Sequence, residues 1–130
     1  MDRASVAYLD THVLIALRRG ETAALGKEAR RLIDRCRLLA SPAAVLELQM
    51  LFEIGRLRQR PPDLISGLSY DVGLEICDLP FSTVAQEALG ETWTRDPFDR
   101  LIVANAKARG AWLVTKDPRI AGHYARAAWD

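Results

Sequence analysis

The sequence predicts an α/β sandwich built around a parallel sheet. Short apolar runs alternate with segments whose apolar residues recur at helical spacing, from one end of the chain to the other. No long linker, low-complexity stretch or internal repeat interrupts this alternation. Chains that alternate strands and helices in this way form parallel sheets with helices packed on their faces.

In the first part of the chain, the expected elements are a strand, two helices, a strand and a third helix, over residues 5–9, 11–19, 22–37, 38–40 and 42–55. The run SVAYL is short and wholly apolar apart from its first residue, which is typical of a buried strand. Ser41 and Pro42 begin the third helix, because Ser caps a helix well and Pro fits its first position. Gly20 and Gly55 mark helix ends.

The second part is expected to contain a weaker helix, a strand, two helices and two short strands, over residues 63–70, 74–79, 82–89, 97–109, 111–114 and 125–129. Ser82 is the expected cap of the helix that it begins. Asp96 and Pro97 repeat the cap-then-proline pattern, and Gly110 ends that helix.

Length and composition favour a single domain over residues 1–130 in the cytoplasm. A chain of 130 residues, 49% of them apolar, can bury a core without disulfides. Its longest apolar runs fall far short of a membrane span, and its first residues do not resemble a signal peptide. Cys36 and Cys77 are isolated, so we expect reduced, buried thiols.

The net charge of +1 hides an asymmetry between the two halves of the chain. Most of the basic residues precede residue 61, most of the acidic ones follow residue 60, and nearly all basic residues are arginine. Arginine suits phosphate partners, so the split weakly favours nucleic-acid binding. Solvated helix faces explain it equally well.

Acidic residues follow the first and the fourth predicted strand. Asp10 comes directly after the first, and Asp117 comes three residues after the fourth. Ligands of parallel sheets bind beyond the carboxyl ends of the strands, so both should lie at one edge. Each could instead simply cap the helix that follows it.

Glu47 and Asp99 are harder to explain by local structure. The helical neighbours of Glu47 are all apolar, and an ionised carboxylate on such a face needs a cation. Asp96 has a sufficient role as helix cap, but Asp99 is a second acid in the same turn and borders a buried face.

Four carboxylates at one sheet edge, Asp10, Glu47, Asp99 and Asp117, would repel each other without a cation. Mg²⁺ and Mn²⁺ prefer such oxygen ligands and can activate water against a phosphodiester. Zinc is not expected, because the chain has no His/Cys cluster.

The sequence resembles PIN-domain proteins, and in particular the VapC-type toxin ribonucleases of toxin–antitoxin pairs. The matching motifs are YLDTHVLIAL, Glu47 in its apolar helix closed by GRL, DPFDRLIVANA and LVTKD, in this order over nearly the whole chain. The resemblance implies a three-layer α/β/α sandwich and an endoribonuclease that depends on Mg²⁺ or Mn²⁺. It also implies RNA as substrate, an antitoxin as partner, and a homodimer or a toxin–antitoxin hetero-oligomer.

By the same resemblance, Asp10, Glu47 and Asp99 match the metal-binding acids of the family, and Asp117 matches its more variable fourth acid. Thr11 and Thr115 match hydroxyl positions near the site. Asp96 is expected beside the four acids, and Arg100 is expected near the substrate.

Other functions remain open from the residues alone. A phosphoacceptor domain would need a second acid beside Asp10, and a haloacid-dehalogenase-type phosphatase would need Asp where His12 stands. An inactive interaction module would need none of the acids. The tryptophans, Trp93, Trp112 and Trp129, are interpreted as core or interface residues.

Overall fold

The computed structural model describes residues 5–130, and five parallel strands form one sheet in it. The sheet has the order β3-β2-β1-β4-β5. The strands are β1 (Val6–Leu9), β2 (Arg37–Ala40), β3 (Glu75–Ile76), β4 (Trp112–Val114) and β5 (Ala127–Ala128). The central strand, β1, pairs with β2 on one side and with β4 on the other. The predicted parallel sheet is thereby confirmed.

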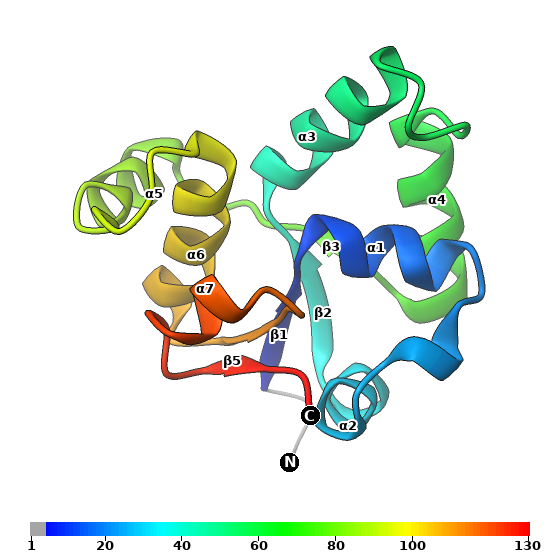
Figure 1. Cartoon of the computed structure of the whole chain (residues 1–130), viewed down its shortest axis with the longest axis horizontal. Helices are drawn as coiled ribbons and strands as arrows, with labels where there is room; N and C mark the ends of the chain where they lie inside the picture. Colours follow the sequence, from blue (N-terminus) through cyan, green and yellow to red (C-terminus); the bar gives the residue numbers. More distant parts are fainter. Residues whose placement is uncertain (1–4) are drawn as a thin grey trace.

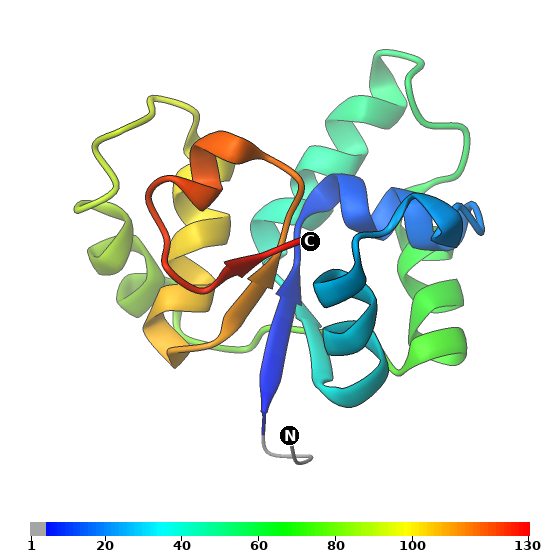
Figure 2. The same ribbon diagram turned by 60° about the horizontal axis from the view of Figure 1, so that its bottom comes forward.

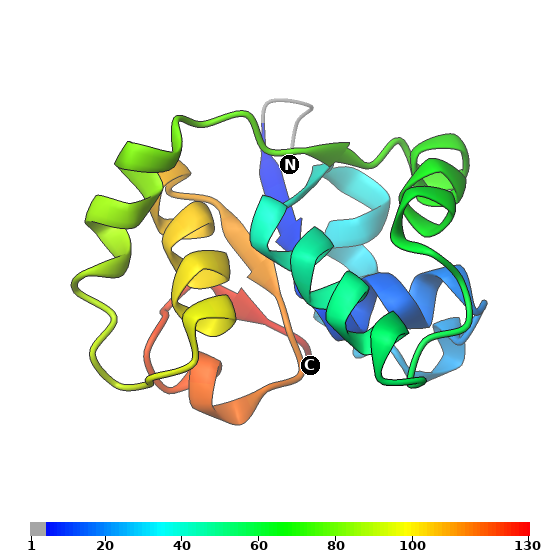
Figure 3. The same ribbon diagram turned by 90° about the horizontal axis from the view of Figure 1, so that it is seen from above.

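Helices flank the sheet on both sides and complete a three-layer α/β/α sandwich. They are α1 (Thr11–Arg18), α2 (Lys27–Arg35), α3 (Pro42–Glu53), α4 (Pro61–Val72), α5 (Phe81–Ala88), α6 (Pro97–Arg109) and α7 (Pro118–Ala121). In Figure 1 and from above in Figure 3, α5 and α6 lie on one side of the strands, and α1, α3 and α4 lie on the other. Within residues 5–130, no helix combines the length and apolar character needed to cross a membrane.

The core lies where the strands meet these helices. Residues 7–9 of β1 are fully buried, which explains why the SVAYL run is apolar on both faces. Leu14 of α1, Leu48 of α3 and Ile102 of α6 are buried against the same cluster. The helices that carry the candidate acids are therefore fixed by apolar packing close to the sheet.

Two predicted caps are observed as expected. Ser41 Oγ accepts a hydrogen bond from the backbone N–H of Ala43, and Asp96 Oδ1 accepts one from Phe98 at 2.9 Å. Gly110 ends α6 with φ of 62°, a conformation that glycine adopts without strain.

The predicted helix over 22–37 was too long at both ends. A 3₁₀ turn occupies Thr22–Ala24, α2 begins only at Lys27, and Arg37 already belongs to β2. Gly26 is the N-cap residue of α2 in an extended conformation, and the backbone of Trp129 lies against it, a contact between distant segments that local sequence does not reveal.

Three smaller predictions were also wrong in detail. The helix expected from Ser82 begins at Phe81 with Pro80 as its cap residue, and the strand expected over 74–79 is limited to Glu75–Ile76. The short helix α7 was missed, although Asp117 and Pro118 repeat the cap-then-proline pattern. Of the two cysteines, Cys77 is buried but Cys36 is only partly so, and neither forms a disulfide.

Candidate active site

The carboxyl ends of β1 and β4 meet at the floor of one cavity. The register pairs Leu9 with Val114, and the backbone N–H of Asp10 donates to the carbonyl of Val114 at 3.0 Å. The cavity has a volume of about 570 Å³. All five acids singled out in the sequence line it, namely Asp10, Glu47, Asp96, Asp99 and Asp117.

Asp10 is buried at the end of β1, and both of its carboxylate oxygens are held. Oδ1 accepts the backbone N–H of Thr11 at 2.8 Å, which caps α1, and Oδ2 accepts the hydroxyl of Thr115 at 2.7 Å. Burial raises the pKa of Asp10, while the bonds from Thr115 and Thr11 oppose that rise. The side chain is therefore rigid and partly stabilised in its charged form.

Glu47 reaches the same cavity from the middle of α3. Its Oε1 accepts a 2.5 Å hydrogen bond from the hydroxyl of Thr11, and no other side chain in residues 5–130 donates to it. Burial raises the pKa of Glu47, and the charge of Asp10 raises it further. The hydroxyl of Thr11 thus lies between the helix carrying Glu47 and the strand end carrying Asp10.

Asp99 lies in the first turn of α6 and accepts no hydrogen bond from the described residues. Burial, followed by the charge of Asp96, raises its pKa to about 6. The charges of Asp10, Asp117 and Glu47 act in the same direction. Because no buried oxygen in residues 5–130 lacks a partner, the oxygens of Asp99 face the open cavity.

Asp117 and Thr115 complete the acid-lined side after β4. Asp117 Oδ1 accepts the backbone N–H of Arg119 at 2.8 Å, so this residue caps α7. Thr115 Oγ1 accepts the backbone N–H of Asp117 at 3.1 Å while its hydroxyl donates to Asp10. The capping interpretation of Asp10, Asp96 and Asp117 is correct, but one cap bond per residue does not account for their shared cavity.

The donor chemistry of the cavity fits a hard divalent cation. Carboxylate oxygens approach from four separate elements, and each raises the pKa of Asp99, as expected where like charges lack a counter-ion. Within residues 5–130, however, no three acidic, histidine or cysteine side chains are close enough together to hold an ion directly. The expected fully assembled ligand set is therefore not seen. Mg²⁺ needs only one or two carboxylates, because it keeps several waters.

Arg100 does not line this cavity. Its Nε donates to the carbonyl of Thr94 at 2.8 Å and its Nη1 to that of Ala88 at 3.5 Å. Its guanidinium thus anchors the segment before α6, and a role of Arg100 near the substrate stays a prediction. The cavity-lining residues that the sequence did not single out for this site are Lys116, Val13, Ala16, Ala24, Pro118 and Trp129, together with His12.

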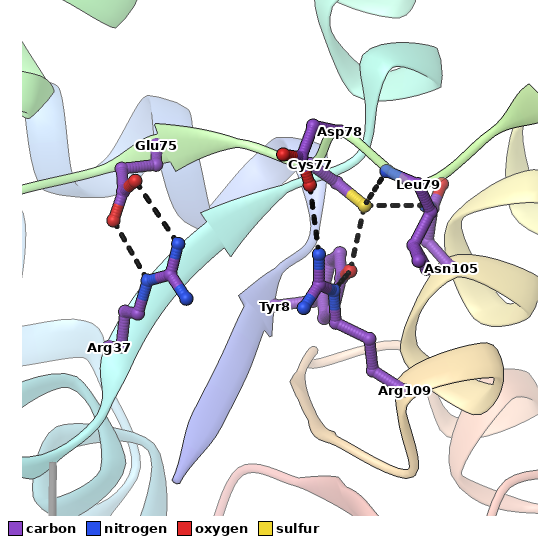
Figure 4. Close-up of polar contacts among 8 residues, drawn as sticks. All are labelled: Tyr8, Arg37, Glu75, Cys77, Asp78, Leu79, Asn105 and Arg109. Carbon is purple, nitrogen blue, oxygen red and sulfur yellow. Dashed lines mark hydrogen bonds and ion pairs between the residues drawn. The ribbon is translucent and has the colours of Figure 1, made fainter. Parts of the chain in front are cut away.

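A chain of buried hydrogen bonds lies behind the site, and sequence reasoning missed it. Asn105 of α6 accepts the hydroxyl of Ser41 and donates to Cys77 Sγ at 3.2 Å. Figure 4 shows the Tyr8 hydroxyl, which donates to the same sulfur at 2.9 Å and accepts from Arg109 Nε at 2.9 Å. Polar residues inside apolar elements, such as Asn105 in LIVANA, were the signal that could have revealed this chain.

Fold and cavity together define the class of protein: a three-layer α/β/α domain with acids at the carboxyl edge of its sheet. The PIN domain family model matches residues 7–126, so the chain belongs to the PIN domain family. No curated protein matches the chain by sequence.

Solved structures with the same fold come from several organisms at low sequence identity. VapBC2 from Rickettsia felis, bound to a DNA fragment from its promoter, has a TM-score of 0.60 at 18% identity, covering 96% of this chain and 99% of that one. DNA-bound VapBC from Salmonella typhimurium has a TM-score of 0.60 at 18% identity, covering 98% of this chain and 96% of that one. VapBC-1 from nontypeable Haemophilus influenzae has a TM-score of 0.60 at 17% identity, covering 90% of this chain and 93% of that one.

Proposed function

We propose that this protein is a metal-dependent endoribonuclease and the VapC-type toxin of a toxin–antitoxin pair. One observation carries the proposal: acids from four separate elements line one cavity at the sheet edge where ligands of such folds bind. A hydrophobic ligand would not require this concentration of like charge. A divalent cation with a phosphate does, because the cation offsets both sets of negative charge.

In this proposal Asp10, Glu47 and Asp99 bind Mg²⁺ or Mn²⁺, one or two of them directly and the others through waters of the ion, and Asp117 assists from the rim. The bound ion would supply the positive charge that polarises the phosphate and lowers the pKa of a water. Thr115 and the backbone of Thr11 keep Asp10 in one orientation, and the Thr11 hydroxyl positions Glu47. These hydrogen bonds fix the orientation of two of the acids, whereas Asp99 has no such partner in residues 5–130.

The comparison structures also bear on the partners. Their names describe VapBC complexes, and two of them contain DNA. We infer that this chain is likewise inhibited by a small antitoxin protein, acts on RNA in the cytoplasm, and forms a homodimer or a toxin–antitoxin hetero-oligomer.

The test is cleavage of single-stranded RNA by the purified protein. Cleavage is expected with Mg²⁺ or Mn²⁺ and should stop with EDTA. Asp10→Asn, Glu47→Gln and Asp99→Asn should each lower the rate by at least about 100-fold, in the range that single electrostatic groups contribute. Asp63→Asn is the matched control, because Asp63 is an exposed acid in α4 outside the cavity.

A second readout separates metal binding from catalysis. Mg²⁺ should raise the melting temperature of the wild-type protein and of Asp63→Asn by mass action, but not that of Glu47→Gln. No RNA cleavage under any metal would refute the nuclease. Cleavage by Glu47→Gln at the wild-type rate would remove Glu47 from the site.

A further inference from the structure

The acid-lined cavity has a second wall that metal chemistry does not require. Besides the carboxylates, the cavity is lined by apolar side chains, namely Val13, Ala16, Ala24, Pro118 and Trp129. At about 570 Å³ the cavity is in the size range of sites for small organic molecules and far exceeds a hydrated ion. Space therefore remains beside the acids for an apolar or aromatic group.

Trp129 differs from the other two tryptophans because no aromatic ring or guanidinium of residues 5–130 stacks on its indole, although the side chain is partly buried against the core. Trp93 stacks on His123 with ring centroids 4.9 Å apart, and the guanidinium carbon of Arg119 lies over its ring, 5.6 Å from the centroid. The guanidinium carbon of Arg126 lies over the ring of Trp112, 5.8 Å from its centroid. Among residues 5–130, Trp129 has no such ring partner, and its indole N–H makes no hydrogen bond. Since no buried nitrogen lacks a partner, that N–H is open to the cavity or to solvent.

Trp129 is nevertheless held in place, because its backbone packs against the start of α2. The carbonyl of Trp129 accepts the N–H of Ala29 at 3.0 Å. A Cβ at Gly26 would lie 1.9 Å from that carbonyl oxygen and 3.0 Å from ring atom Cδ1, so only glycine fits there. Figure 2 shows β5, in red, beside β4, in orange, and Trp129 directly follows β5 and lines the same cavity as Asp10. Trp129 is thus a fixed side chain of the cavity.

We propose that the wall formed by Trp129, Ala16 and Ala24 is the seat of one RNA base, next to the phosphate held at the acids. The inference rests on the proposed function. Single-stranded RNA is recognised by unstacked bases that lie on aromatic side chains. Ala16 and Ala24 are the smallest apolar side chains in the lining, so they take up little of the cavity beside the indole. Lys116 and His12 line the same cavity and supply cationic or donor groups for the adjoining phosphate.

This arrangement predicts that the enzyme prefers single-stranded RNA over duplex. A base can reach Trp129 only when it leaves its stack, and a paired base cannot do so without breaking the pair. The seat accepts any base, because each base has a face that can stack.

The experiment measures RNA affinity separately from catalysis. Short fluorescent RNAs are titrated with Mg²⁺ into protein carrying Asp99→Asn, so that the RNA stays intact. Adding Trp129→Ala should weaken binding roughly 10-fold, in the range seen for loss of one stacked base. Trp129→Phe should retain most of the affinity, which rules out misfolding as the cause. Trp93→Ala is the matched control, since Trp93 lies outside the cavity.

The RNA provides the second arm of a double-mutant cycle. RNAs that each lack one base should bind the protein with intact Trp129 as tightly as the complete RNA, except when the missing base is the one that stacks on Trp129. With that RNA, Trp129→Ala should cause no further loss of affinity. Gly26→Ala should weaken RNA binding in the same direction by displacing the ring. RNA affinity unchanged by Trp129→Ala, or additive losses at every abasic position, would overturn the base seat and leave this wall to a protein partner. In that case cleavage of RNA by the wild-type protein would still support the proposed function.

Discussion

The Ser41 hydroxyl donates a 2.5 Å hydrogen bond to Oδ1 of Asn105, and this bond ties together the two helices that carry Glu47 and Asp99. Ser41 is also the N-cap of α3, and Asn105 lies on α6. Both side chains are buried, with 1% and 2% of their surface exposed. A bond in this position joins the start of α3 to the middle of α6, so we expect it to influence the spacing of Glu47 and Asp99.

Asn105→Ala should loosen that spacing. The variant leaves the buried hydroxyl of Ser41 without its acceptor, so we expect a loss of about 1–3 kcal/mol in the free energy of unfolding. Mg²⁺ affinity, measured by calorimetry, should also fall. Cys77→Ala is the control, because it cuts the same chain of hydrogen bonds beyond Asn105 and leaves the Ser41 bond intact. Equal Mg²⁺ affinity in the two variants would show that Asn105 serves stability alone.

Asp99→Asn should stabilise the metal-free protein above pH 6. The pKa of Asp99 is about 6 in the folded protein against a usual value of 3.8, so between these values the folded state binds more protons than the unfolded state. The free energy of unfolding therefore falls as the pH rises from 3.8 to 6, and above pH 6 the full destabilisation by the ionised Asp99 remains. The variant lacks this cost, so we expect a melting temperature higher by about 4 °C at pH 7.5.

The pH dependence of that difference is the decisive measurement. The gain from Asp99→Asn should shrink as the pH falls from 6 to 4, and it should vanish only well below 3.8, where wild-type Asp99 is protonated in both the folded and the unfolded state. A gain that is the same at pH 4 and pH 7.5 would mean that charge is not the cause.

Asp96 should tolerate asparagine but not alanine. Its side chain caps α6 through the N–H of Phe98, a role that Asn performs equally well, whereas Ala costs about 1 kcal/mol. In unfolding experiments, wild type and Asp96→Asn should therefore have similar free energies of unfolding, and Asp96→Ala should have a lower one. RNA cleavage by Asp96→Asn should remain within a few-fold of wild type. Inactivation as deep as that of Asp99→Asn would place Asp96 among the metal ligands.

RNA affinity should fall steeply with salt, because phosphate contacts release counter-ions. Arg19 and Arg58 line a second, smaller cavity of about 220 Å³ between α1 and α4, and neither forms an ion pair within residues 5–130. Arg58→Ala should reduce the slope of log affinity against log salt by about 0.7. Arg37→Ala is the control, since Arg37 is paired with Glu75. A slope of zero for the wild-type protein would exclude a phosphate track.

The sequence by itself determined the type of fold and most of the candidate site. Alternating apolar runs and helical periodicity are local patterns, and they placed five strands and six of the seven helices in the right order. Glu47 stood out because a charge inside an apolar helix has no local explanation, and Asp10 and Asp117 because residues after parallel strands gather at one sheet edge.

Only the tertiary structure decided which residues act together across the chain. Arg100 adjoins Asp99 in sequence, yet its guanidinium reaches backbone carbonyls away from the cavity. Trp129 was interpreted from the sequence as a core or interface residue, but it lines the cavity, and its backbone lies against Gly26, about a hundred positions away. Such contacts depend on the packing of whole elements against the sheet, and no spacing within one element encodes them.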